Sequence, residues 1–241
     1  MRIRILGIGM GPQHVTPEVA TALRGCDYVV AAAKAEDDAL LAIRREVCAA
    51  YGVELVAVPD PARDREPAGD GGYVRAVADW HEARVAAYRA VLEERGGTAA
   101  FLVWGDPALY DSTIRVVSQI TQDYDVLPGI SAPQLLAARH RIVLHAVGQP
   151  VHITTARRLR ADIAAGQRNL VVMLGAALDA DGLDDWSIWW GANLGAPSEE
   201  LVAGRVGDVR TSIEAARARA RETAGWVMDL SLLRAPDEAT P

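Results

Sequence analysis

The segment 104–113 combines residue types that could hold a ligand or move a proton. It reads Trp-Gly-Asp-Pro-Ala-Leu-Tyr-Asp-Ser-Thr and follows the apolar run 99–103. Gly105 lets the backbone approach a ligand closely, and Pro107 pushes Asp106 toward an extended conformation. An apolar run bounded by Gly and Pro is typical of a buried parallel strand, and open α/β sheets bind ligands at the carboxyl ends of such strands. We therefore expect the Asp106 carboxylate to be held at a strand tip, in the floor of an active site.

The same segment has a plainer interpretation. Asp111 or Ser112 could cap a helix over residues 113–120, because a side-chain oxygen there accepts hydrogen bonds from backbone N–H groups at the helix start. The segment would then be an ordinary turn between a strand and a helix. This segment alone does not distinguish a ligand-binding turn from an ordinary turn, so other parts of the sequence are needed.

A glycine-rich turn also follows the first predicted strand. Residues 2–6 alternate charged and apolar side chains and run into Gly9-Met10-Gly11-Pro12. A helix is predicted over 17–24, with Thr16 as its N-cap, Pro at its first position and Gly25 after its end. The third glycine of the dinucleotide fingerprint is missing, and the second strand, 28–32, ends without the acidic residue that binds ribose. This pattern disfavours a nicotinamide site.

A third turn completes the set. The predicted strand 124–127 ends in Pro-Gly-Ile-Ser-Ala and precedes a helix over 133–139. The turns at Gly9, Gly105 and Gly129 are then expected at the carboxyl ends of neighbouring parallel strands, where they would form a pocket.

The elements between these turns fit a βα alternation. The hydrophobic pattern predicts a helix over 37–50, a strand over 53–58 and a helix over 74–95. Residues 59–72 are dense in Pro, Gly, Asp and Arg without periodicity, which indicates a long surface loop, and such loops often act as lids.

After Arg141 the pattern changes to short strands, some close enough to pair antiparallel. We expect strands at 151–155, 170–174, 187–190, 200–203 and 226–230, with helices at 159–165 and 213–222. The sequence thus predicts an α/β fold with two α/β domains. The first, 1–141, has a mainly parallel sheet, and the second, 142–241, has a mixed one.

The composition of the chain disfavours nucleic-acid and membrane partners. The chain has 241 residues, half of them hydrophobic, and a formal net charge of −7. Without a Lys or Arg run of the kind that binds a phosphate backbone, nucleic acid is not an expected partner. No apolar stretch reaches the ~18 residues of a membrane span, and the first strand is unlike a signal core. We expect a soluble, cytoplasmic protein.

Few residues could bind metal or form a disulfide. The only cysteines are Cys26 and Cys48, and the five histidines are scattered, so neither a metal site nor a disulfide is predicted. Lys34 is the only lysine. Arginine suits bidentate carboxylate recognition, although GC-rich coding produces the same bias.

The three turns together resemble the tetrapyrrole methylase superfamily. The resemblance lies in the glycine-rich first turn, the Gly-Asp-Pro-x-x-Tyr-x-Ser stretch at 105–112 and the Pro-Gly-Ile-Ser-Ala turn at 128–132. Within that superfamily, the strings 104–113, 149–155 and 225–234 are similar to corrin-ring methyltransferases of cobalamin synthesis, and the likeness covers nearly the whole chain.

The resemblance implies two α/β domains with S-adenosyl-L-methionine in the cleft between them, a precorrin substrate and a homodimer. It also implies the residues that contact the cofactor. These are Met10, Gly105, Asp106, Leu109, Tyr110, Ser131, Ala132, Met173 and Ala192. The first turn departs from the frequent Gly-Pro-Gly-Asp ending, which puts an acidic role for that loop in doubt.

The implied reaction is methylation of an electron-rich ring carbon, with loss of a two-carbon fragment as acetate after addition of water. Alignment of donor and acceptor alone can contribute roughly 7–11 kcal/mol to such a displacement, without a covalent catalyst. Acetate loss needs a general acid or base. The sequence does not identify it, and Asp111, Tyr110 and His14 are candidates only through their nearness to the motifs.

A substrate with many carboxylates should meet guanidinium groups. Arg157 and Arg158 are the main candidates, with Arg160, Arg139 and Arg141 nearby. A solvated helix face explains the same residues. The pair Trp189-Trp190 could stack on a macrocycle, but a place in the core of the second domain is the preferred interpretation.

Three alternatives stay open. The chain could be another methylase of the superfamily, acting on a different precorrin or on a protein side chain. It could be a non-catalytic carrier of a tetrapyrrole or of the cofactor. A nicotinamide dehydrogenase is the most distant possibility.

Overall fold

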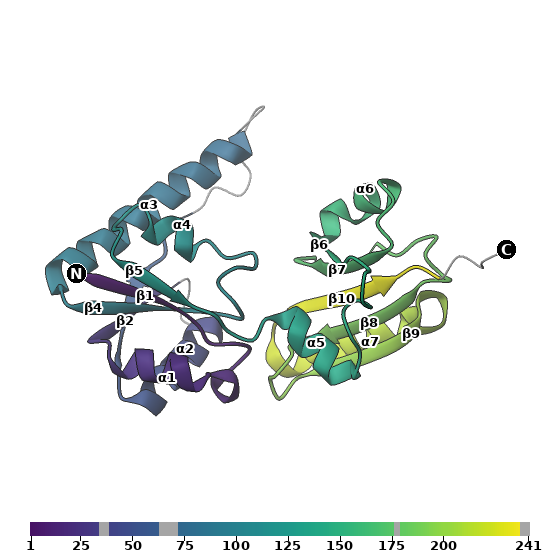
Figure 1. Ribbon diagram of the computed structural model, residues 1–241, viewed down its shortest axis with the longest axis horizontal. Helices are drawn as coiled ribbons and strands as arrows, with labels where there is room; N and C mark the ends of the chain where they lie inside the picture. The colour runs from purple at the N-terminus through teal and green to yellow at the C-terminus, as the bar shows by residue number, and fades with distance from the viewer. Residues whose placement is uncertain (34–38, 63–71, 176–178, 237–241) are drawn as a thin grey trace. The chain divides into compact units, whose positions relative to one another are not determined.

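The chain folds into two compact units, each built on a sheet of five strands (Figure 1). The computed structural model describes residues 1–33, 39–62, 72–175 and 179–236. The first unit is Met1–Ile130 and the second is Ser131–Pro241.

The sheet of the first unit is parallel, as predicted. Its strands pair in the order β3-β2-β4-β1-β5, and every pairing is parallel. The strands are β1 (Arg2–Gly7), β2 (Tyr28–Ala33), β3 (Glu54–Pro59), β4 (Thr98–Val103) and β5 (Tyr124–Leu127). The strands β4, β1 and β5, which lead into the three glycine turns, are therefore direct neighbours.

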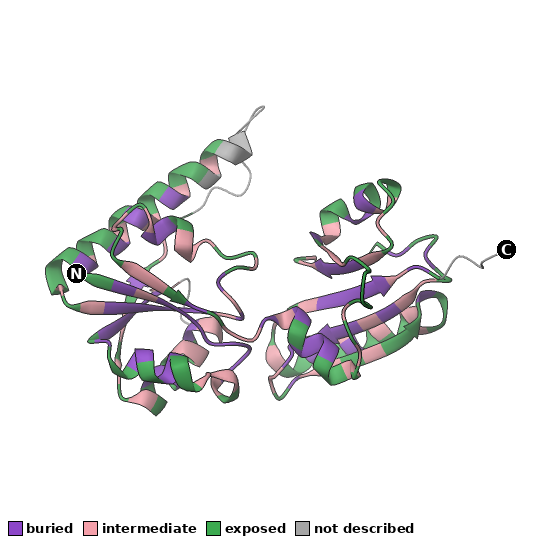
Figure 2. Ribbon diagram, in the orientation of Figure 1, coloured by how far each residue is buried: buried purple, intermediate pink, exposed green. Residues whose placement is uncertain are grey.

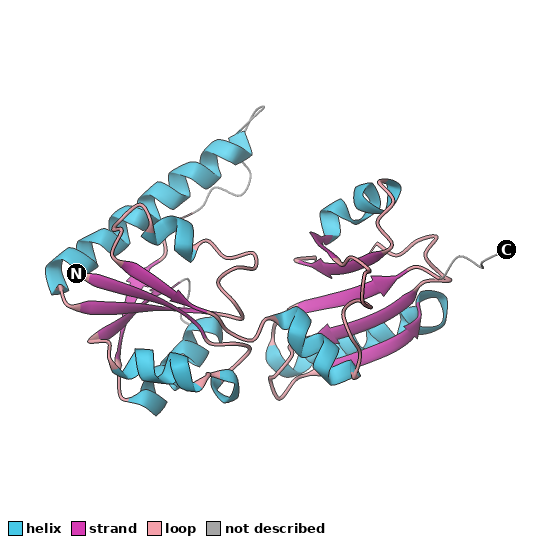
Figure 3. Ribbon diagram, viewed as in Figure 1, coloured by secondary structure: helices cyan, strands magenta, loops and turns pink. Residues whose placement is uncertain are grey.

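Helices cover both faces of this sheet (Figure 3). They are η1 (Pro12–His14), α1 (Pro17–Arg24), α2 (Ala39–Tyr51), α3 (Gly72–Arg95) and α4 (Thr113–Val117). Leu23 of α1 and Val47 of α2 share one buried cluster, whereas Leu92 of α3 and Val117 of α4 share the other. Burial on both faces explains the continuous apolar run of β4.

The predicted caps of α1 are confirmed. The Thr16 hydroxyl accepts a hydrogen bond from the Val19 N–H at 3.2 Å, Pro17 opens the helix and Gly25 ends it. Between the first glycine turn and this helix lies the short helix η1.

The sheet of the second unit is mixed, also as predicted. Its order is β6-β7-β10-β8-β9, in which only the β6–β7 pairing is parallel. Its elements are α5 (Ala132–His140), β6 (His152–Thr155), η2 (Ala156–Arg158), α6 (Leu159–Ala164), β7 (Asn169–Met173), β8 (Ser187–Ala192), β9 (Glu200–Arg205), α7 (Val206–Ala224) and β10 (Asp229–Arg234).

Helix α5 belongs to the second unit, whereas the sequence placed the domain boundary after Arg141. It packs on β8, β9 and β10. A Cβ on Gly191 of β8 would stand 2.8 Å from Leu136 Cδ1, so the helix lies close against the strand. Helices α6 and α7 contribute Leu159 and Ala216 to the core on the opposite face, and Figure 2 shows the buried strands between these layers.

The last strand begins at Asp229, three residues later than its predicted start at Trp226. Asn193, at a φ of 46° and 1% exposed, explains the delay. Its side chain donates to the Trp226 carbonyl at 3.2 Å and accepts from the Met228 N–H at 2.9 Å. These bonds hold the segment before Asp229 as a loop.

Other predicted boundaries also shift. Helix α7 starts at Val206 instead of residue 213. Helix α4 ends at Val117 instead of residue 120, and residues 118–120 form a turn. Residues 63–71 of the loop predicted over 59–72 lie outside the described part of the chain, as does the start of the helix predicted from residue 37.

Both cysteines are free, and burial raises the pKa of each thiol to about 11. Because the thiolate is the reactive form, we expect Ellman's reagent to modify Cys26 and Cys48 slowly in the native protein at pH 8. Both should react promptly in denaturant. Fast native labelling would contradict the buried placement of these side chains.

Candidate functional site

The first and second glycine turns are joined by backbone hydrogen bonds. Gly9 N–H donates to the Gly105 carbonyl at 3.1 Å, and Gly105 N–H donates to the Gly9 carbonyl at 2.7 Å. The expected convergence at the carboxyl ends of β1 and β4 is therefore present.

The third turn packs against the other two so closely that only glycine fits. A Cβ on Gly129 would stand 2.2 Å from the Gly105 carbonyl oxygen, and one on Gly7 would stand 2.4 Å from Gly129 N. Real Cβ atoms essentially never approach other atoms this closely. The three turns thus form one continuous backbone surface, which we call the glycine cradle (Gly7, Gly9, Gly105 and Gly129).

Asp106 links two turns of the cradle. Its Oδ1 accepts from the Ala108 N–H at 2.8 Å, and its Oδ2 accepts from the Gly129 N–H at 2.9 Å. The carboxylate lies at the strand tip as predicted, but both of its oxygens bind backbone N–H groups. Asp106 therefore positions the second and third turns.

Met10 and His14 belong to the first turn. Met10 is 4% exposed, and its Sδ lies 3.8 Å from the position of a Cβ on Gly105. The Met10 N–H donates to His14 Nδ1 at 3.3 Å. His14, a weak acid–base candidate from sequence, therefore holds the first turn in shape.

Leu109, Tyr110 and Asp111 follow the second turn. The Leu109 N–H donates to the Asp106 carbonyl at 3.2 Å. Tyr110 has a φ of 49° and is 48% exposed, a strained backbone and an exposed ring of the kind found at ligand sites. Asp111 Oδ1 accepts from the Thr113 N–H at 2.6 Å, whereas the N-cap residue Ser112 makes no capping bond with its side chain.

Ser131 and Ala132 start helix α5. The Ser131 N–H donates to Gln134 Oε1 at 2.9 Å, and the Ser131 hydroxyl accepts from the Gln134 N–H at 3.5 Å, which is a capping box. Ser131 is 6% exposed. The cap fixes the backbone at the point where the third turn becomes a helix.

Met173 and Ala192 lie near a hollow at one end of the second sheet. Met173 lines the hollow, and Ala192 pairs across the sheet with Asp229, which also lines it. The hollow is open to solvent, and the space of about 250 Å³ at this place includes part of that solvent. Its lining is Ala156, Val172, Met173, Gly175, Trp190, Asp229, Leu230 and Ser231.

The carboxylate of Asp229 is fixed within this hollow. Its Oδ2 accepts from Trp190 Nε1 at 3.2 Å and from Arg217 Nε at 3.1 Å, and its side chain is 11% exposed. Trp190 is 2% exposed, which confirms its predicted place in the core. Trp189 lies beneath the Arg234 guanidinium, 5.1 Å from the ring centre.

Most of the arginines proposed to bind substrate already pair with acidic residues. Arg139 binds Glu199 at 2.9 Å, and Arg158 binds Asp162 at 3.1 Å. Arg157 is exposed and has no ion pair among the described residues. Arg157 is therefore the member of its pair that is available to a carboxylate.

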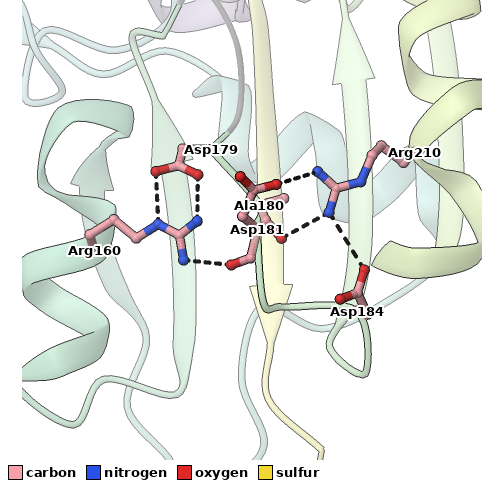
Figure 4. Close-up of polar contacts among 6 residues, drawn as sticks. All are labelled: Arg160, Asp179, Ala180, Asp181, Asp184 and Arg210. Carbon is pink, nitrogen blue, oxygen red and sulfur yellow. Dashed lines mark hydrogen bonds and ion pairs between the residues drawn. The ribbon is translucent and has the colours of Figure 1, made fainter.

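Arg160 is held by the segment between β7 and β8 (Figure 4). Its guanidinium binds both oxygens of Asp179 and the carbonyl of Asp181, and the hydrogen bond with Asp179 raises the pKa of Arg160. Arg210 holds the same segment through Asp181 and Asp184. These contacts make Arg160 a structural residue.

A polar cluster in the second unit was not predicted from the sequence. His152 Nε2 lies 3.2 Å from Asp162 Oδ2, and the Thr154 hydroxyl donates to the same oxygen at 2.5 Å. The alternation of β6 puts His152 and Thr154 on one face, but no sequence pattern shows that α6 folds back over that face. Only this return brings Asp162 to the histidine.

The described residues contain no group of three or more potential metal ligands. Within the same ranges, no helix is both long and apolar enough to cross a bilayer.

Comparison with known proteins relates the chain to a methylase family. A family model described as tetrapyrrole (corrin/porphyrin) methylases matches residues 2–210. A precorrin-6A synthase (deacetylating) from Sinorhizobium sp. is 41% identical over 250 residues, covering 97% of this chain and 95% of the relative.

Solved structures agree with this relationship. A cobalamin synthesis related protein, CobF, from Corynebacterium diphtheriae has a TM-score of 0.82 at 34% identity, over 98% of this chain and 99% of that one. A uroporphyrin-III C-methyltransferase from Thermus thermophilus, complexed with S-adenosylhomocysteine, has a TM-score of 0.59 at 16% identity, over 97% and 92% of the chains. At that identity the second likeness concerns the fold.

Proposed function

Because the chain belongs to the tetrapyrrole (corrin/porphyrin) methylase family, we propose that it is the methyltransferase that converts precorrin-5 into precorrin-6A. It uses S-adenosyl-L-methionine, methylates C-1 and releases acetate with the addition of water. The observation that carries the donor site is the glycine cradle, where three turns meet at one edge of the first sheet.

The cradle supports the methyl donor because its turns meet backbone to backbone at one sheet edge, with open space beside Gly105, where a Cβ would meet Met10 Sδ at 3.8 Å, an ordinary contact. We assign donor binding in the first unit to Met10, Gly105, Asp106, Leu109 and Tyr110, with Ser131 and Ala132 at the start of α5. Met173 and Ala192 complete the proposed set in the second unit, where the hollow offers apolar side chains to a heteroaromatic base.

The chain's contribution to methyl transfer is alignment. The bound donor supplies an electrophilic methyl group, and the macrocycle supplies the carbon nucleophile. Turns locked by backbone hydrogen bonds and by the Asp106 carboxylate hold the donor in one orientation, and such positioning can be worth roughly 7–11 kcal/mol. No protein nucleophile is required.

Arg157 is the proposed partner of a substrate carboxylate. We expect Arg157→Ala to raise KM for precorrin-5 about tenfold, because a charge-assisted hydrogen bond typically contributes about 1.5 kcal/mol or more. The affinity for S-adenosylhomocysteine should not change. Steady-state kinetics and calorimetry measure the two quantities.

Arg221→Ala is the matched control, since Arg221 is an exposed arginine of the same unit. It should leave KM unchanged. An unchanged KM in Arg157→Ala would remove this residue from the substrate site. Arg158 is less suitable for the test because it also binds Asp162.

The function is tested with a panel of precorrins and methyl-labelled S-adenosylmethionine. We expect label transfer and acetate release with precorrin-5 alone. Transfer to a different precorrin or to a protein would favour another methylase of the family, and binding without transfer would favour a carrier. A melting temperature raised by NAD, but not by S-adenosylhomocysteine, would contradict the proposed cofactor.

Assembly and location complete the proposal. We infer a homodimer, as the family resemblance implies, in the cytoplasm, where cobalamin synthesis would use a freely diffusing substrate. Sedimentation velocity at micromolar concentration should give twice the mass of the 25.8 kDa chain.

A further inference from the structure

A histidine and a buried aspartate form a pair on the edge strand of the second sheet. His152, the first residue of β6, presents Nε2 to Asp162 Oδ2 at 3.2 Å. Asp162 lies on α6 and is 5% exposed, whereas the His152 side chain is 37% exposed. The pair therefore joins a buried carboxylate to an imidazole that solvent can reach.

The carboxylate is held in its ionised form. The Thr154 hydroxyl donates to Asp162 Oδ2 at 2.5 Å, and Arg158 donates to Oδ1 at 3.1 Å. The hydrogen bond from Thr154, then those from Arg158 and His152, lower the pKa of Asp162 against the opposing effect of burial. Each partner is a donor, so Asp162 acts as an acceptor on all sides.

This arrangement fixes which imidazole nitrogen is basic. Because Nε2 faces a carboxylate that only accepts, the proton of the neutral ring belongs on Nε2. Nδ1 then carries the lone pair. A buried carboxylate that orients a histidine in this way is the geometry by which enzymes prepare a general base.

The pair lies on the same face of the sheet as the hollow. Thr154 pairs with Val172, Val172 pairs with Ser231, and Ser231 pairs with Trp190, so these residues form one row across four strands. The last three of them line the hollow. His152 stands on the same face, two residues before the row along β6, whereas Ala156 and Met173 of the hollow lie beyond the row.

We propose that His152, oriented by Asp162, is the general base that activates water for acetate release; this inference rests on the proposed function. Nδ1 takes a proton from water as the water oxygen bonds to the carbonyl carbon of the two-carbon fragment. The bond from that carbon to the ring then breaks, and its electron pair passes to the macrocycle. The fragment leaves as acetic acid, which ionises to acetate, and His152 returns its proton to solvent.

The sequence-based candidates suit this task less well. His14 Nδ1 accepts a backbone N–H in the first turn, and Asp111 Oδ1 accepts one at the start of α4. Deprotonating water with either group would compete with a hydrogen bond that shapes the donor site. His152 contacts Asp162 through Nε2, and its Nδ1 is the proposed base.

The test is single-turnover acetate release from precorrin-5 with S-adenosylmethionine. We expect His152→Ala to slow acetate release about 100-fold or more, the usual loss when a general base is removed. Its affinity for S-adenosylhomocysteine and its melting temperature should stay near those of the parent protein. Added imidazole should restore the rate at least tenfold, because the half-exposed site can admit it.

Two further variants sharpen the test. His152→Gln keeps a side-chain N–H for Asp162 without a base and should be as slow as His152→Ala. His145→Ala, which removes an exposed histidine of the same unit, should release acetate at the parent rate.

Acetate release by His152→Ala at the parent rate would overturn the inference. A slow variant that imidazole does not restore, with weakened binding of S-adenosylhomocysteine, would overturn it as well, since His152 would then be structural. If the parent protein itself released no acetate from precorrin-5, the proposed function would fail instead.

Discussion

Gly129→Ala is expected to lower the melting temperature of the protein by about 6–12 °C and to weaken S-adenosylhomocysteine binding more than tenfold. The new Cβ would stand 2.2 Å from the Gly105 carbonyl oxygen and 2.7 Å from the Gly7 carbonyl carbon, both rigid backbone atoms. Overpacking of this kind costs about 3 kcal/mol, and each kcal/mol lowers the melting temperature of a chain this long by about 2–4 °C. Scanning calorimetry and isothermal titration measure the two effects.

Gly25→Ala is the matched control, because Gly25 also follows an element and its φ of −89°, like the φ of Gly129, lies outside the left-handed region. A Cβ there would meet its nearest atom, the Ala22 carbonyl oxygen, at 3.4 Å, which is ordinary contact. Its melting temperature should change by less than about 2 °C, as for most substitutions away from special features. Equal effects in the two variants would mean that the close packing of the turns is unimportant.

Asp106→Asn is expected to reduce S-adenosylhomocysteine affinity about 10- to 100-fold. The two carboxylate oxygens accept from the Ala108 and Gly129 N–H groups, so an amide must turn its NH2 toward one of these donors. A lost hydrogen bond to a charged group costs about 1.5–3 kcal/mol. The second and third turns would then separate at the donor site, which titration calorimetry would register as a higher Kd.

Asp27→Asn separates this effect from a general loss of charge. Asp27 Oδ2 also accepts a backbone N–H, from Thr98 at 2.7 Å, but at the start of β4. An amide can keep that single bond by presenting its oxygen. The variant should bind S-adenosylhomocysteine like the parent protein, and a comparable loss of affinity would argue against a local role for Asp106.

The convergence of the turns could be predicted from sequence because two simple rules apply to it. Apolar runs such as 99–103 are typical of parallel strands, and parallel strands end at a common edge. Gly105 was expected where the backbone approaches a ligand, whereas the structure shows that Gly129 lies where two turns approach each other. In the structure the strand order β4-β1-β5 makes the three strands direct neighbours, so the turns that follow them meet.

The role of Asp106 could not be predicted in the same way. Sequence placed its carboxylate at a strand tip, but the second partner, the Gly129 N–H, is 23 residues away. Whether a carboxylate faces a ligand or a neighbouring turn depends on strand order and register, which local patterns do not contain. The same limit hid the return of α6 that brings Asp162 to His152.

The domain boundary moved for a related reason. The sequence changes character after Arg141, where the short strands begin, so α5 looked like the last helix of the first domain. In the structure its contacts are with β8, β9 and β10 of the second sheet. The position of α5 in the sequence therefore suggested the wrong domain. The packing of Leu136 against Gly191 places this helix in the second unit.

The most direct test of the donor site is a crystal structure of the protein with S-adenosylhomocysteine bound. We predict that the ligand will lie at the carboxyl ends of β4, β1 and β5, in contact with Met10, with the Gly105–Tyr110 segment and with Ser131. A ligand bound at the amino ends of these strands, or remote from the glycine cradle, would contradict the account.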